Sequence, residues 1–126
     1  MERNAVGFYW TLPVPWVGFT TLPDDIDEAA KKSRTIRYQR DLIQHYARGE
    51  RYRLIYEEVF LEIGPDRGSR LIVEPLNKVK AICQRQNAVL LYVDFWEVQG
   101  WRTHHALRNW LDRAGIEVLR SIPTRF

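Results

Sequence analysis

The clearest hydrophobic signal in the chain is a run of six consecutive apolar or aromatic residues, 88–93 (AVLLYV). The run shows no alternation of apolar and polar positions, which is typical of a strand covered on both faces in a parallel sheet. It leads into Asp94, and Glu97 follows three residues later. Functional residues of parallel α/β sheets follow the carboxyl ends of the strands, so we expect a site near this point.

Shorter apolar stretches alternate with segments whose apolar residues recur at helical spacing. The other predicted strands are residues 5–10, 52–63 and 116–119. The predicted helices are residues 34–48, 73–84 and 103–114. This alternation predicts one α/β domain over residues 1–126. We expect three layers: a four-stranded parallel sheet with helices on both faces.

Two stretches depart from this regular alternation. Glu57 and Glu58 place charges in the second strand, which predicts an edge strand because edge charges discourage unwanted pairing. Residues 12–33 contain three prolines and are predicted to form a long irregular loop insertion. Trp16 and Phe19 in this loop are expected to cover a pocket or a partner site, or to pack onto the core.

The first predicted helix carries one polar residue on its apolar stripe. Ile36, Ile43 and Tyr46 define the stripe, and Gln39 lies on it too. A buried glutamine needs hydrogen-bond partners, and the backbone of a loop is the usual source. Ser33 is a plausible N-cap for this helix.

Composition excludes several classes of protein. The chain has 126 residues and a single cysteine, Cys83, so an intramolecular disulfide and a cysteine zinc site are excluded, and a reducing cytoplasm is the expected location. Neither a signal peptide nor a membrane span is predicted. Glycine-rich nucleotide motifs are absent, so we expect no cofactor. His104 and His105 point about 100° apart on a helix, so we expect no metal site.

The distribution of charge says more than its sum. The net charge is +3, but residues 31–53 include eight basic residues and only two acidic ones, Asp41 and Glu50. A basic helix can neutralise phosphates, so DNA is a candidate partner; a merely solvated surface is the alternative. The DNA-binding candidates are Arg34, Arg37, Arg40 and Arg70.

Several segments together resemble the catalytic domain of the serine recombinases, the resolvase/invertase family. Residues 35–40 (TIRYQR) are similar to its Ser-Leu-x-x-Gln-Arg helix start, and residues 60–62 with the 64–70 turn are similar to the end of its second strand and its mobile loop. The similarity covers residues 5 to about 122. It implies the same α/β fold, association into homodimers, and a DNA-cleaving site.

The chain departs from that family where the chemistry should lie. The family's first strand ends in Arg-x-Ser, whose serine attacks the DNA phosphate, whereas this chain has Trp10-Thr11-Leu12. The family's central strand ends in Leu-Asp-Arg-Leu-x-Arg, whereas this chain has residues 95–100 (FWEVQG). Losing arginines removes the cations that stabilise charge on phosphate oxygens. The remaining catalytic candidates are Thr11, Gln39, Glu62, Arg70 and Arg102.

Three functional hypotheses follow. The first is a catalytically inactive resolvase-like module that binds DNA or a protein, the protein contacting aromatic residues at the strand ends (Trp10, Trp16, Trp96 and Trp101). The second is an active DNA recombinase that uses Thr11 or Ser33 as nucleophile, with Arg34, Arg70 and Arg102 as phosphate clamps. The third is a different enzyme that pairs Asp94 with Glu97. We favour the first hypothesis.

Overall fold

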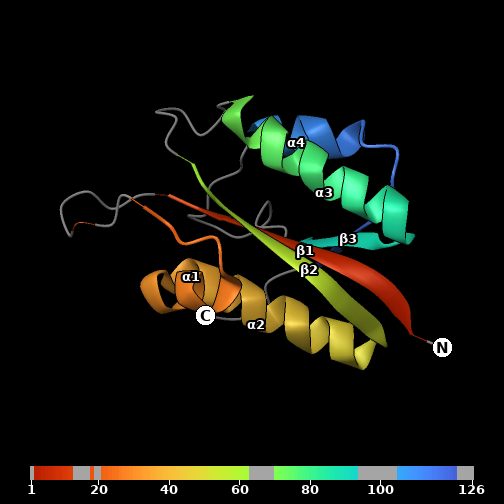
Figure 1. Cartoon of the computed structure of the whole chain (residues 1–126), viewed down its shortest axis with the longest axis horizontal. Helices are drawn as coiled ribbons and strands as arrows, with labels where there is room; N and C mark the ends of the chain where they lie inside the picture. Colours follow the sequence, from red (N-terminus) through yellow and green to blue (C-terminus); the bar gives the residue numbers. More distant parts are fainter. Residues whose placement is uncertain (1, 13–17, 19–20, 63–69, 94–104, 122–126) are drawn as a thin grey trace.

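The computed structural model describes residues 2–12, 18, 21–62, 70–93 and 105–121 (Figure 1). Its strands are β1 (Arg3–Thr11), β2 (Tyr52–Leu61), β3 (Val89–Val93) and β4 (Val118–Ser121). They form one sheet in the order β2-β1-β3-β4, and every neighbouring pair is parallel. The predicted four-stranded parallel sheet is therefore confirmed.

Helices cover both faces of this sheet, as predicted. They are α1 (Ile26–Lys32), α2 (Arg34–Gly49), the 3-10 turn η2 (Arg70–Ile72), α3 (Val73–Gln86) and α4 (His105–Asp112). Figure 1 shows α1 and α2 on one face and α3 and α4 on the other. Because side chains alternate along β1, Tyr9 enters the core on the α2 side while Phe8 enters the core on the α3 side.

The predicted helix cap and the predicted buried stripes are found in the structure. The Ser33 hydroxyl accepts a hydrogen bond from the Ile36 amide at 3.1 Å and so caps α2. The predicted stripe of α2 is buried at Ile36, Gln39 and Ile43. On α3, the predicted inner residues Leu76, Val79 and Cys83 are also buried, which confirms Cys83 as a core residue.

The bounds of several elements differ from the sequence prediction. Residues 12–33 are not irregular throughout, because α1 occupies residues 26–32 with Asp25 accepting from the Glu28 amide as its N-cap. The short length of α1 hid it in the sequence. The last strand begins at Val118 rather than residue 116.

Strand β2 is an edge of the sheet, as its two glutamates led us to expect. The pairing of β1 with β2 shifts between Ala5 and Val6, because Leu54 and Tyr56 are their respective partners and Ile55 is left as an extra residue. After this bulge Gly7 lies opposite Glu57. The bulge therefore determines which β2 side chains face α2.

Candidate functional site

Three of the predicted catalytic residues lie around the carboxyl end of β1, and all three are buried. Thr11 is 8% exposed, Gln39 is 1% exposed and Glu62 is fully buried. The Glu62 amide donates to the Thr11 carbonyl oxygen at 2.9 Å, which continues the pairing of the two strands. Arg70 begins η2, although its side chain lies outside the described residues, and so does all of Arg102.

Gln39 has a structural role that accounts for its burial. Its amide nitrogen donates to the Trp10 carbonyl oxygen at 2.8 Å, and its amide oxygen accepts from the Trp10 backbone N–H at 3.3 Å. The partner is thus the backbone of a strand, not of a loop as the sequence suggested. Both ends of the amide are occupied, so Gln39 is not available to contact a phosphate.

Trp10 is buried rather than exposed, which corrects its assignment to an exposed aromatic cluster. It is only 8% exposed and belongs to the core on the α3 side, with Phe8 and Leu76. Alternation along β1 directs it away from α2. The other aromatic residues of that cluster (Trp16, Trp96 and Trp101) lie outside the described residues, as do Phe19, Asp94 and Glu97.

Exposed cations gather where α1 ends and α2 begins. We call Lys31, Lys32, Arg34 and Arg37 the cationic surface, because all four are exposed. Lys31 pairs with Glu28 at 3.1 Å, and both side chains are more than half exposed, so this pair is weak. No ion pair joins Lys32, Arg34 or Arg37 to another described residue.

Arg40, the third predicted DNA contact on α2, is engaged within the protein. Its guanidinium donates to the Asp41 carboxylate at 3.0 Å and to the Asp27 carboxylate at 3.3 Å. Because Asp27 belongs to α1, the bond to Asp27 ties α1 to α2. The arginine side chain is only 21% exposed. Arg40 is therefore a poorer phosphate ligand than Arg34 or Arg37.

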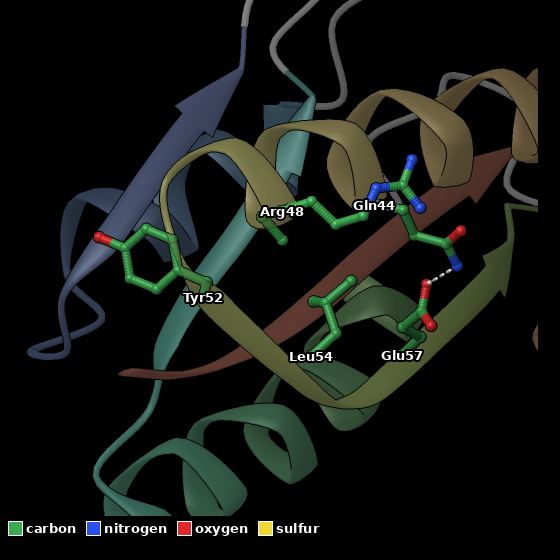
Figure 2. Close-up of a pocket in the computed structure, with 6 residues that line it drawn as sticks. Gln44, Arg48, Tyr52, Leu54 and Glu57 are labelled. Carbon is green, nitrogen blue, oxygen red and sulfur yellow. Dashed lines mark hydrogen bonds between the residues drawn. The ribbon is translucent and has the colours of Figure 1, made fainter. Parts of the chain in front are cut away.

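A groove of about 290 Å³ lies between the second half of α2 and strand β2 (Figure 2). Its lining residues are Gln44, Ala47 and Arg48 from α2, and Tyr52, Leu54 and Glu57 from β2. Figure 2 shows the Arg48 side chain reaching along α2 toward Gln44, so that its guanidinium and the Glu57 carboxylate lie at the same end of the groove. Leu54 and then Tyr52 continue along β2 from that end.

The Glu57 carboxylate is held by two donors. Its Oε2 atom accepts the Tyr9 hydroxyl at 2.7 Å and, less closely, the Gln44 amide nitrogen at 3.4 Å. Tyr9 is fully buried, and desolvation together with the adjacent Glu57 charge raises the pKa of its phenol above the ordinary value. Tyr9 therefore remains a proton donor to Glu57 throughout the physiological pH range.

Gly7 is required for this arrangement. A Cβ atom at Gly7 would lie 2.5 Å from the Tyr9 hydroxyl oxygen and 2.9 Å from the adjacent ring carbon. Both residues project from the same face of β1, because they are two positions apart. The glycine thus leaves the space in which Tyr9 reaches Glu57.

Sequence reasoning did not identify this groove. The spacing of Gln44 and Arg48, four residues apart on a predicted helix, places them on one surface, and Gly7 and Tyr9 share one face of a strand. These signals are common and carry no specificity by themselves. The decisive pairing with Glu57 depends on the bulge at Ile55, which the sequence does not indicate.

The described part of the chain shows neither a reactive cysteine nor a metal site. The Cys83 thiol is buried, and desolvation raises its pKa to about 11, so it is a poor nucleophile. No group of three or more potential metal ligands occurs within the described ranges. None of the described helices is both long and apolar enough to span a bilayer.

Comparisons with known proteins give no family for this chain. No family model matches the sequence, no curated protein matches it, and no solved structure matches its fold. Functional assignment therefore rests on the chemistry of the residues described above.

Proposed function

We propose that this protein is a resolvase-like α/β domain that binds nucleic acid through its cationic surface and does not cleave it. The observation that carries this proposal is the exposure of Lys31, Lys32, Arg34 and Arg37 at the junction of α1 and α2. A cationic side chain that neutralises a phosphate displaces counterions condensed on the nucleic acid, and it can do so only if it is not already paired within the protein. Lys32, Arg34 and Arg37 meet this condition among the described residues, whereas Arg40 does not.

The surroundings of the candidate nucleophiles support a role without cleavage. Attack on a phosphate requires a hydroxyl within reach of the phosphorus and of a base. Thr11 is buried at the end of β1, and the buried Ser33 hydroxyl is used to cap α2. Trp10 occupies the position where the resemblance leads one to expect an arginine, and its side chain is in the core. An active recombinase is therefore the weaker alternative.

The proposal is tested by fluorescence anisotropy with a labelled 20-base-pair duplex and a single strand over a series of salt concentrations. We expect log affinity to fall linearly with log salt concentration for the wild type. In the double variant Arg34→Ala/Arg37→Ala, this line should become less steep: the magnitude of its slope should fall by roughly 1.8, since each phosphate contact contributes about 0.9. The sequence of the duplex should matter little, because the cationic surface offers only phosphate contacts.

The matched control removes the same charge elsewhere. Arg85 on α3 and Arg113 after α4 are exposed and lie on the other side of the sheet. Arg85→Ala/Arg113→Ala should keep the wild-type slope. Equal losses in the two double variants would show a general charge effect and would refute the proposed surface. Incubation of the wild type with supercoiled plasmid should leave it intact; nicking would revive the active recombinase.

A further inference from the structure

We propose that the groove between α2 and β2 binds a small zwitterion of the α-amino acid class with an apolar side chain. This inference concerns a different surface from the cationic one and does not depend on nucleic-acid binding. It rests on the charges that line the groove, on its apolar floor and on its size.

The groove presents one negative and one positive charge at the same end. Glu57 uses only Oε2 for the bonds from Tyr9 and Gln44, and Oε1 accepts no hydrogen bond from another described residue. The Arg48 guanidinium lies at this end too, and no ion pair joins it to Glu57 or to another carboxylate in the described part of the chain (Figure 2). Two residues of opposite charge thus line one groove, and neither is paired with the other.

An α-amino acid carries the complementary charges on one carbon atom. Its ammonium group can donate to Glu57 Oε1 while its carboxylate accepts the paired N–H groups of Arg48, a geometry that guanidinium favours. A simple amine would leave Arg48 unpaired, and a simple acid would place its negative charge beside Glu57. The zwitterion is the ligand class that satisfies both residues at once.

The rest of the groove suits an apolar side chain. Leu54 and Ala47 line it, and Tyr52 follows beyond them. The Tyr52 ring is stacked on Tyr46 with centroids 6.2 Å apart and planes 15° apart, which holds it in place. A volume of about 290 Å³ is at the lower limit of ligand pockets, roughly 300–1,000 Å³. This volume accommodates an amino acid.

The experiment is a titration followed by ¹H–¹⁵N NMR with three matched probes: L-leucine, the amine that lacks its carboxylate (3-methylbutylamine) and the acid that lacks its amino group (4-methylpentanoate). We expect leucine to shift the amide signals of residues 44–48 and 52–57. Each truncated probe should bind at least about tenfold more weakly, since each loses one charge-assisted contact.

Variants assign the two contacts. Glu57→Gln keeps an acceptor for the Tyr9 hydroxyl but removes the charge. Arg48→Gln removes the opposite charge at an exposed position, where substitutions usually change stability little. Each should weaken leucine binding at least about tenfold, while Arg85→Gln on α3 should not change it. If Glu57→Gln does not fold, the Arg48→Gln and truncated-probe results still decide. Leucine that causes no shifts up to about 10 mM, or binds no better than 4-methylpentanoate, overturns the proposal.

Discussion

At the scale of single residues, the unusual feature is a buried tyrosine whose hydroxyl is bonded to a partly exposed carboxylate. A buried hydroxyl without an acceptor would be costly, so Tyr9 and Glu57 stabilise the fold together. Gly7 permits the pair because any side chain there would meet the Tyr9 hydroxyl. The Tyr9 ring is packed in the core and cannot swing away as an exposed side chain would.

We therefore expect Gly7→Ala to lower the free energy of unfolding by about 1–3 kcal/mol, through overpacking and loss of the Tyr9–Glu57 bond. Urea denaturation monitored by circular dichroism measures this change. Gly49→Ala is the matched control: it lies at the end of α2, where a new Cβ meets nothing within 4 Å. That variant should be neutral or up to about 1 kcal/mol more stable. A Gly7→Ala protein as stable as wild type would show that Tyr9 is not confined.

At the scale of elements, α2 is the helix on which the candidate sites depend. It carries Arg34 and Arg37 of the cationic surface near its start and the groove residues Gln44 and Arg48 near its end. Its position over the sheet is fixed by Gln39, whose amide binds both backbone groups of Trp10. The pairing of β1 with β3 extends only to Phe8. Beyond it, the Gln39 amide hydrogen-bonds to the Trp10 backbone.

Replacing Gln39 by methionine tests this link between α2 and β1. Methionine is similar in size but removes the two hydrogen bonds between the Gln39 amide and the Trp10 backbone, so we expect a loss of about 2–4 kcal/mol in unfolding free energy. Chemical denaturation gives the value. Gln84→Met on α3 changes an exposed glutamine in the same way and should alter stability by less than about 0.5 kcal/mol. Similar small effects at both positions would mean that water replaces the Gln39 amide.

Elements were predictable where the pattern is long and periodic. The run at 88–93 predicts β3 because burial on both faces leaves no polar position, and the stripe from Ile36 to Tyr46 predicts α2. Helix α1 was missed because seven residues give too little periodicity. The groove was missed because it depends on contacts between distant segments: Tyr9 and Glu57 are 48 positions apart, and the bulge at Ile55 sets their register.

At the scale of the whole molecule, β2 and β4 are the edge strands of the sheet, and the two are of unequal length. Strand β4 has four residues, whereas β2 has ten and could pair with a second copy of the chain. Three features oppose such pairing: the bulge at Ile55, and the carboxylates of Glu57 and Glu58, which direct negative charge toward opposite faces of the edge. Lys78 of α3 contacts Glu58 at 3.4 Å and further covers one face.

We therefore expect a monomer of 15.0 kDa in size-exclusion chromatography with light scattering, although the resemblance to recombinases suggested a homodimer. The double variant Glu57→Gln/Glu58→Val removes both charges but keeps an acceptor for the Tyr9 hydroxyl, so its mass should rise with protein concentration. A wild-type mass twice the monomer value at every concentration would contradict this reasoning. If the wild type were such a dimer and the variant eluted as the same dimer, Glu57 and Glu58 would take no part in the dimer interface. That interface would then lie away from the β2 edge.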